Sequence, residues 1–528
     1  MNTLEPSNIE TMQSLVRGAA GHLQGSLDNE QIELYDLAFS EAEIYAALAL
    51  NRLAMATGNS MLEGLARYFE AEVCMEVRYR LAKRPDSYGL QQSDIPIFPG
   101  LEQYLNPSSI ADLGQSVLQD GVPDQPLDEA QRIIRHTFRQ FADEQVKPLA
   151  ESIHREDRII PDAILDPLRE MGCFGLSVPE RFGGLKPDDH EDSVGMVVVT
   201  EELSRGSLGA AGSLITRPEI MARAILEGGT PEQQGRWLPG IAAGDPLCAI
   251  SVTEPNTGSD VASVSLKATQ VDGGWLLNGG KTWCTFAGKA GSILVLARTE
   301  PGASPPHRGL SLFVVEKPVY DGYDFEYKQD TGGCVTGRAI STLGYRGMHS
   351  FEMFYDDFFV PSENLIGEAV GRGKGFYFTM RGFMGGRLQT AARATGLMRA
   401  AFEDAVTYAN ERKVFGRAVA QYPLSLAKVA KMAAYITACR AFTHEVAAMM
   451  DRGEGAMEAS LVKLIACKAA EWVTREALQI HGGMGYAEET SVSRYFADAR
   501  VLSIFEGAEE TLAIRVVGKS LVERSRAK

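Results

Sequence analysis

Apolar side chains recur at helical spacing over three long stretches of the chain. Near the N-terminal end they follow one another at three- and four-residue steps, on one face of a helix; they are Leu62, Leu65, Phe69, Val73 and Val77. Pro85 is expected to end that helix, since proline has no backbone N–H to continue it. Helical spacing resumes over residues 128–244 and again from Gly375 to the end of the chain.

The pattern changes between Pro246 and Gly367, where short runs rich in β-branched and aromatic residues replace the helical spacing. These runs are 275–279, 292–299, 310–317 and 351–360. A hairpin turn is expected at Asp272-Gly273-Gly274, and the Pro- and Gly-rich stretch 85–127 is expected to be an irregular connector. We therefore predict a mostly α chain with a central β domain. Its expected parts are a helical N-terminal extension with connector (1–127), a helical domain (128–245), a β domain (246–367) and a C-terminal helical domain (368–528).

Composition narrows the class of protein. The chain has 528 residues, 45% of them hydrophobic, which fits several globular domains. A net charge of −17 disfavours nucleic acid as a partner. Charged residues interrupt the apolar runs well before the ~20 residues that a membrane span needs, so none is expected. The start of the chain has no signal-peptide pattern, and its 7 dispersed cysteines suit reduced thiols, so a cytoplasmic protein is expected.

Near the C-terminal end, Glu506 stands between Phe505 and Gly507, after the glycine pair Gly482-Gly483. A lone carboxylate in an apolar setting suits proton abstraction from a weak carbon acid, because desolvation raises its pKa. On its own, however, Phe-Glu-Gly is more often a turn or the start of a helix.

Three other segments can bind a flat, polar ligand. Residues 248–260 (CAISVTEPNTGSD) offer hydroxyls and a glycine, although a solvated turn explains them equally well. In KTWCTF (281–286), Trp283 and Thr285 share one face of a regular strand, although a core tryptophan is the commoner explanation. In NERKVFGRAV (410–419), Arg412 late in a helix could bind an anion or only complement the helix dipole.

Taken together and in order, these segments resemble the acyl-CoA dehydrogenase family over about residues 128–520. The motifs are VTEPNTGSD, KTWCT, GGRLQTAARATG (385–396), ERKVFG, QIHGG and FEGAEE. The resemblance implies a three-domain fold of helical, β-barrel-like and helical domains, to which this chain adds its N-terminal extension. It also implies FAD, held by the β and C-terminal domains, an acyl-CoA substrate and an electron-transfer flavoprotein as electron acceptor.

The resemblance assigns roles to individual residues. Thr253, Gly258 and Ser259 correspond to contacts with the flavin, Trp283 to the indole that shields it, and Thr285 to the hydroxyl near N5. Residues on the C-terminal side correspond to adenosine and pyrophosphate contacts across a subunit interface, which implies at least a homodimer; they are Arg412, Phe415, Gln479, Gly482 and Gly483.

Glu506 corresponds to the base that removes the α-proton of the thioester, with its own backbone N–H helping to bind the thioester oxygen. Ser259, Arg387 and Gly507 correspond to acyl-CoA contacts. Some relatives place the base before the helix arginine, but Gly386 stands there in this chain. Where relatives often have Glu-Gly-Thr, this chain has Ala508, so a cofactor-binding hydroxyl is missing.

The leader, residues 330–361 and SLITRPEI (213–220) resemble family members that oxidise (2S)-methylsuccinyl-CoA to mesaconyl-CoA. The distal carboxylate of such a substrate needs a cationic clamp inside an apolar cavity. Arg217 is our first candidate and Arg346 the second, while a surface salt bridge remains an open alternative for Arg217. The leader is expected to pack on the dehydrogenase core and to favour a dimer over a tetramer.

Two other functions stay open at this stage. An acyl-CoA oxidase would use the same base and differ in oxygen access to the reduced flavin. A DNA-associated flavoprotein of the same superfamily is disfavoured by the acidic charge of the chain.

Overall fold

The structure is a computed structural model that describes residues 7–526. It contains two compact units. Unit one combines the two ends of the chain, Met1–Arg135 and Thr390–Lys528, and unit two is the continuous segment His136–Gln389. Helix α12 (Gly375–Glu411) runs through the point where the chain passes from unit two to unit one.

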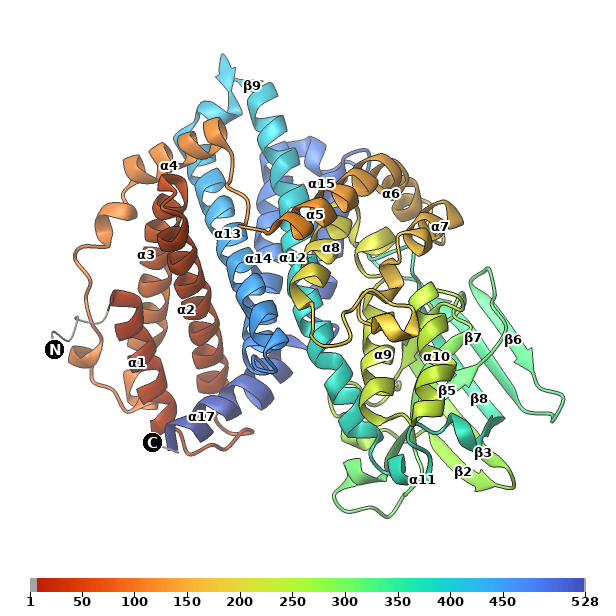
Figure 1. The fold of residues 1–528 in the computed structure, drawn as a ribbon. Coiled ribbons are helices and arrows are strands. Elements are labelled where there is room, and N and C mark those ends of the chain that lie inside the picture. The colour runs from red at the N-terminus through yellow and green to blue at the C-terminus, as the bar shows by residue number, and fades with distance from the viewer. Residues whose placement is uncertain (1–6, 527–528) are drawn as a thin grey trace. The chain divides into compact units, whose positions relative to one another are not determined.

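Over its described residues, unit one is helical apart from one small hairpin, and its long helices α2, α3, α13 and α14 can be followed in Figure 1. Its N-terminal helices are α1 (Asn8–His22), α2 (Gln31–Thr57), α3 (Ser60–Ala82), α4 (Pro107–Asp120) and the start of α5 (Glu129–Phe141). Its C-terminal helices are α13 (Pro423–Asp451), α14 (Glu458–His481), α15 (Ser491–Leu502), α16 (Glu509–Thr511) and α17 (Lys519–Arg526), with the π-helix η13 (Leu512–Gly518) between the last two.

The N-terminal helices pack directly on the C-terminal helices of the same unit. Helices α2, α3 and α4 all contact α13, and α2 also contacts α14. One close approach is at Gly114 of α4, where a Cβ atom would lie 2.1 Å from the carbonyl oxygen of Leu426. Because the backbones of α4 and α13 meet directly there, only glycine fits.

Residues 85–127 are not the irregular connector that we expected throughout. They contain α4, which begins at Pro107 with Asn106 as its N-cap. Proline suits the first position of a helix, where the N–H would be unpaired anyway, so this proline marks a helix start that we took for a breaker. The predicted end of the preceding helix is confirmed, since α3 ends at Ala82 and a 3₁₀ turn begins at Pro85.

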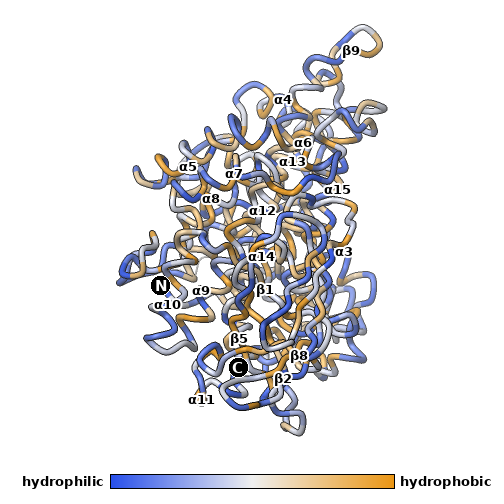
Figure 2. The backbone as a smooth tube through the Cα atoms, turned by 90° about the vertical axis from the view of Figure 1, so that its right-hand side faces the viewer, coloured by the Kyte–Doolittle hydropathy of each residue, from blue (hydrophilic) through white to orange (hydrophobic). Residues whose placement is uncertain are grey.

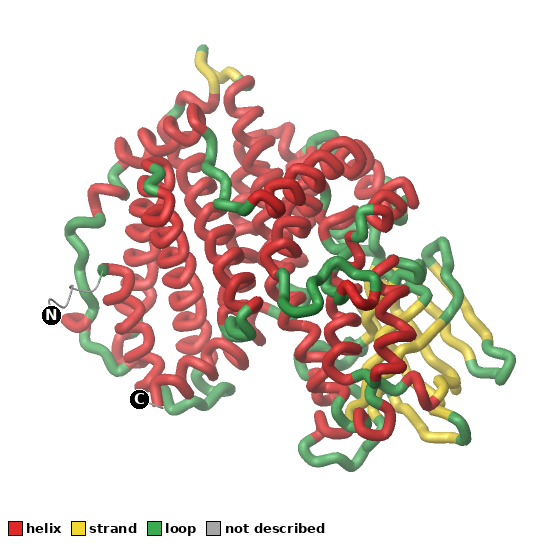
Figure 3. Tube along the Cα trace, in the orientation of Figure 1, coloured by secondary structure: helices red, strands yellow, loops and turns green. Residues whose placement is uncertain are grey.

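Unit two has helices and one mixed sheet, whose strands are yellow in Figure 3. Its helices, besides the end of α5 and the start of α12, are α6 (Lys147–Arg155), α7 (Asp162–Glu170), α8 (Ser193–Gly206), α9 (Thr216–Gly228), α10 (Pro231–Ala243) and α11 (Glu368–Gly371). Two π-helices, η4 (Ala142–Val146) and η7 (Leu208–Gly212), follow α5 and α8.

The sheet confirms the strands that the apolar runs predict. Its strands are β1 (Cys248–Ser251), β2 (Lys267–Val271), β3 (Gly274–Thr285), β4 (Ser292–Arg298), β5 (Leu310–Glu316), β6 (Asp324–Lys328), β7 (Cys334–Ile340) and β8 (Ser350–Pro361). Their order is β1-β4-β2-β3-β8-β7-β6, with β5 paired to β4. The expected hairpin joins β2 to β3, with Val271 opposite Gly274. The sheet of the described residues does not close into a barrel, so the domain is a mixed open sheet.

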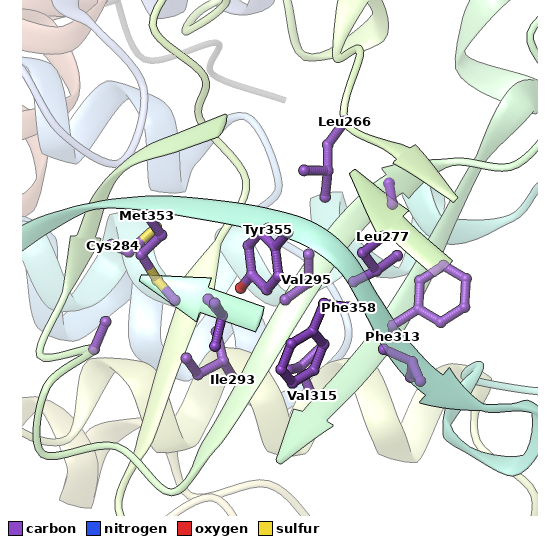
Figure 4. Packing of buried hydrophobic residues seen from close by; sticks show 14 of the residues in the cluster. Leu266, Leu277, Cys284, Ile293, Val295, Phe313, Val315, Met353, Tyr355 and Phe358 are labelled. Carbon is purple, nitrogen blue, oxygen red and sulfur yellow. The ribbon is translucent and has the colours of Figure 1, made fainter. Parts of the chain in front are cut away.

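One face of this sheet buries a cluster of large apolar side chains, shown from close by in Figure 4. Phe313, Tyr355 and Phe358 lie at its centre and are almost completely buried. Burying a side chain of this size contributes ~1.5–3 kcal/mol. This core holds β3 and β8 firmly, and β3 carries two of the candidate site residues.

Hydrophilic and hydrophobic residues are mixed along the whole tube in Figure 2. Among the described residues, no helix combines the length and the apolar character that crossing a membrane requires.

Candidate functional site

The candidate residues fall into both units. In unit two, the loop after β1 carries Thr253, Thr257 and Ser259. Thr253 is half-buried and Ser259 is exposed. Among the described residues, no hydrogen-bond partner is found for these hydroxyls, so they can all bind a ligand. The Thr253 carbonyl accepts a hydrogen bond from the Thr282 N–H at 2.9 Å, which places this loop beside Trp283.

A buried ion pair fixes the same loop to β3. The Lys281 Nζ lies 2.9 Å from the Glu254 Oε1 and also donates to the Val252 carbonyl at 2.8 Å. Glu254 in turn accepts hydrogen bonds from Ser265 and from the Leu266 N–H. Burial raises the pKa of Glu254, but Lys281 and these donors outweigh it and hold the pKa below its usual value. Neither residue was a sequence candidate, and their role is to hold the hydroxyl-bearing loop in place.

Trp283 occupies a bulge in β3. One extra residue lies between Lys281 and Cys284 relative to β8, and Trp283 has a φ of 58°. We predicted that Trp283 and Thr285 share one face of a regular strand. The bulge interrupts that alternation, and bulges commonly redirect a side chain in this way. The indole is 55% exposed, whereas Thr285 is buried and its Oγ1 lies 2.9 Å from the Ser350 Oγ. An exposed aromatic plane beside unpaired hydroxyls fits a flat ring with a polar edge, such as a flavin.

Arg217, near the start of α9, is 6% exposed. Its Nη1 donates to the Ser213 carbonyl at 2.8 Å, and its Nη2 donates to the Tyr345 hydroxyl at 3.1 Å. No carboxylate within residues 7–526 pairs with this guanidinium. The alternative of a surface salt bridge is therefore wrong. A buried cation with only neutral partners is costly, and an anionic ligand would compensate it.

Arg346 is committed to structural contacts. It donates to the carbonyls of His154 and Thr342, and its Nε lies 3.4 Å from the Asp157 Oδ1. The loop that carries it approaches η7 closely, because a Cβ on Gly209 would lie 2.3 Å from the Arg346 carbonyl oxygen. The adjoining Tyr345 has a φ of 58°. Arg346 therefore holds the loop, and Tyr345 faces Arg217.

Arg387 and Gly386 lie within α12, in its unit-two part, and Arg387 is half-buried. A glycine carries no proton-accepting side chain, so the sequence leaves no base at that position.

In unit one, Glu506 lies in the turn between α15 and α16. Its φ is 54°, and that of Gly507 is 97°. Among the described residues, the buried Glu506 Oε2 has no hydrogen-bond partner, and no acceptor is found for the Glu506 N–H. A carboxylate oxygen with no other hydrogen-bond partner is available to accept a proton from a substrate, as the role of a base requires.

Two contacts hold this turn, and the sequence did not reveal either. The Lys463 Nζ donates to the carbonyls of Phe505, at 2.9 Å, and Gly507. The Arg393 guanidinium lies 4.6 Å from the centre of the Phe505 ring. Both cations sit on helices that read as ordinary amphipathic segments, so only the three-dimensional structure identifies them.

The remaining unit-one candidates are exposed. They are Arg412, Phe415, Gln479, Gly482 and Gly483. Phe415 is 99% exposed at the tip of the hairpin formed by β9 (Lys413–Val414) and β10 (Arg417–Ala418). Arg412 directly follows α12, and its N–H donates to the Tyr408 carbonyl at 2.9 Å, so the alternative of a helix-dipole partner stays open. These residues are therefore accessible to a ligand or a partner.

Comparisons with known proteins match three consecutive parts of this chain, which together carry the candidate residues. Residues 128–245, 249–358 and 373–522 match, in that order, the N-terminal, middle and C-terminal domains of acyl-CoA dehydrogenase. A (2S)-methylsuccinyl-CoA dehydrogenase from Cereibacter sphaeroides is 44% identical over 399 residues, which cover 75% of this chain and 70% of that protein. The chain belongs to the acyl-CoA dehydrogenase family.

Solved structures support the same assignment. The butyryl-CoA dehydrogenase of Megasphaera elsdenii is similar with a TM-score of 0.68 and 29% identity, covering 76% of this chain and all of that one. A glutaryl-coenzyme A dehydrogenase in complex with glutaryl-CoA has a TM-score of 0.67 and 27% identity, over 75% of this chain and 95% of that one. As an acyl-CoA dehydrogenase, the chain is an FAD-dependent oxidoreductase that acts on CH–CH bonds. No group of metal-binding side chains is found in the part of the chain that the structure describes.

Proposed function

We propose that this acyl-CoA dehydrogenase oxidises a short branched dicarboxylic thioester, (2S)-methylsuccinyl-CoA, to mesaconyl-CoA. The observation that carries the proposal is Arg217, a buried guanidinium whose partners among the described residues are a carbonyl and a phenol. The distal carboxylate of the substrate would supply the missing negative charge. The likeness to the Cereibacter sphaeroides enzyme supports the same substrate.

Glu506 would act as the base. Its unpaired Oε2 would take the α-proton, and its backbone N–H, for which no acceptor is found among the described residues, would donate to the thioester oxygen. That hydrogen bond strengthens as negative charge develops on the oxygen. FAD, when bound, would accept the hydride that leaves the β-carbon, so the α-proton and the β-hydride together account for the new double bond.

The cofactor fits the residues of both groups. Thr253, Gly258, Ser259, Trp283 and Thr285 would hold the flavin. Arg412, Phe415, Gln479, Gly482 and Gly483 would bind the adenosine end of an FAD in a second subunit, so we propose a homodimer. Their exposure supports this role. Ser259, Arg387 and Gly507 are proposed acyl-CoA contacts, and an electron-transfer flavoprotein the electron acceptor.

The test is anaerobic bleaching of the bound flavin by a panel of acyl-CoA thioesters. We expect methylsuccinyl-CoA to bleach it, while butyryl-CoA and glutaryl-CoA leave it oxidised. Glu506→Gln should retain FAD and lower the bleaching rate by at least about 100-fold, the contribution typical of a general base. A colourless protein that takes up no FAD, or a Glu506→Gln variant as fast as the native enzyme, would overturn the mechanism. Bleaching by butyryl-CoA alone would overturn the substrate.

A further inference from the structure

Lys463 is a buried lysine on α14, 1% exposed, whose ammonium reaches the turn that carries Glu506. It donates to the Phe505 carbonyl and to the Gly507 carbonyl, the two on either side of Glu506 in the sequence. A buried ammonium is costly unless its donors are satisfied. The bonds to the carbonyls on both sides of Glu506 stabilise the buried ammonium and fix the turn to α14.

The backbone of the turn needs such support. Glu506 and Gly507 are consecutive residues with positive φ, at 54° and 97°. For a residue with a side chain, this conformation is unfavourable and persists only where the surrounding structure enforces it. Gly507 is not readily exchanged for a residue with a side chain, because such residues rarely adopt its φ of 97°.

The bond to the Phe505 carbonyl also sets the direction of the Glu506 N–H. These two groups belong to one planar trans peptide, in which the C=O and the N–H point in opposite directions. When the carbonyl points at Lys463, the N–H of Glu506 must point away from it. A cation on the carbonyl also polarises the peptide and makes its N–H a stronger donor.

We propose that Lys463 is the positioning residue for Glu506. By fixing the carbonyls on both sides, it holds the Glu506 carboxylate in one orientation and aims the Glu506 N–H away from α14. The Arg393 guanidinium over the Phe505 ring fixes the neighbouring side chain of the same turn. The inference rests on the proposed role of Glu506 as base.

The test compares Lys463→Met, which keeps the length and loses the donors, with Lys463→Arg, which keeps donors for both carbonyls. Lys468→Met is the matched control, because Lys468 lies on the same helix and pairs with the Glu509 carboxylate instead, at 3.2 Å. Each variant is purified with FAD bound. The measurements are kcat, KM, the isotope effect of α-deuterated substrate, and hydrogen exchange of the holoenzyme over residues 501–512.

We expect Lys463→Met to lower kcat by roughly 10- to 100-fold, the loss typical of a catalytic group displaced by about 1 Å. KM should change less than about threefold, since binding energy resides elsewhere. The α-deuterium isotope effect should increase, because proton removal becomes slower, and exchange over residues 501–512 should accelerate. Lys463→Arg should recover part of kcat, and Lys468→Met should match the native enzyme in all four measurements.

An unchanged kcat and isotope effect in FAD-loaded Lys463→Met would overturn the inference. If that variant does not fold, Lys463→Gln provides the test, because its shorter, neutral side chain loses the cation and the reach to both carbonyls. Native kcat, isotope effect and exchange in Lys463→Gln would overturn the inference equally. Glu506→Gln measured alongside separates the two proposals. Native activity in Glu506→Gln would refute the proposal that Glu506 is the base. An inactive Glu506→Gln together with a fully active Lys463→Met would refute only the positioning role of Lys463.

Discussion

Replacing Arg217 by methionine should change which substrate the enzyme prefers. The methionine fills a similar volume and removes the charge, so the apolar surroundings stay packed. The useful comparison is between methylsuccinyl-CoA and 2-methylbutyryl-CoA, which differ by a carboxylate against a methyl group. If Arg217 pairs with the carboxylate, only the first substrate should lose affinity.

The size of the effect follows from the surroundings of the guanidinium. Arg217 is 6% exposed and, among the described residues, has no carboxylate partner, so bulk water cannot replace the lost pair. Truncating one partner of a buried charge pair costs ~2–5 kcal/mol, which corresponds to roughly 30- to 5,000-fold in kcat/KM. We expect a loss in this range with methylsuccinyl-CoA. With 2-methylbutyryl-CoA, kcat/KM should stay constant or rise, because a buried uncompensated cation has been removed.

The assay is kcat/KM for both thioesters with an artificial electron acceptor, on variants matched for FAD content. Arg223→Met is the control, because Arg223 lies on the same helix and already has carboxylate partners, Glu219 at 2.8 Å and Glu191 at 3.2 Å. Its loss should affect stability and leave the ratio of the two substrates unchanged. Tyr345→Phe, which removes one hydrogen bond from Arg217, should give a smaller loss in the same direction. A ratio that moves less than about threefold in Arg217→Met would refute carboxylate recognition at this residue.

Two further predictions concern charge and assembly. Burial lowers the pKa of Lys317 to about 7 in the folded protein, where its Nζ donates to the Gly288 and Pro318 carbonyls. In the unfolded chain the lysine pKa is ~10.4, so between pH 7 and 10 the unfolded chain binds more protons than the folded protein. The free energy of unfolding therefore rises with pH over that range. Lys317→Met should therefore show a smaller gain in Tm from pH 7 to pH 9 than the native protein, and identical gains would contradict this. Phe415→Ala should weaken FAD retention and reduce the mass in light scattering from two chains towards one; a native FAD content and mass in this variant would exclude the interface role.

The elements of the fold were largely readable from spacing and turn residues. Strands β3, β4, β5 and β8 coincide with the predicted runs. Strands β4 and β5 are buried almost throughout and need continuous apolar stretches, whereas β8 largely alternates buried and exposed positions. Helix α4 was missed because Pro107 stands at its first position, where proline favours a helix instead of ending it. The hairpin at 413–418 was also missed. Its turn residue Phe415 has a positive φ of 47°, which few residues of its type adopt.

The site was predictable only where chemistry is tied to a motif. The sequence motifs pointed to Glu506, Trp283 and Thr253, and the need for a cation pointed to Arg217. By contrast, Lys463 and Lys281 act through backbone carbonyls and a buried carboxylate that are distant in the sequence. Which carbonyl a lysine reaches depends on tertiary packing, so no local pattern distinguishes these two from lysines on a solvated face.

Unit one is built from the first and last parts of the chain, which has a consequence for biosynthesis. Helix α1 contacts α17, and Arg526 donates to the Leu23 and Gln24 carbonyls. On the ribosome, α1 to α4 emerge long before the helices that bury them have been translated, whereas unit two is continuous and can fold as soon as it is complete. The nascent leader must therefore keep its apolar faces protected while more than two hundred intervening residues are synthesised. Synonymous changes that slow translation of this middle segment should lengthen that exposure and increase the dependence of the newly made protein on chaperones.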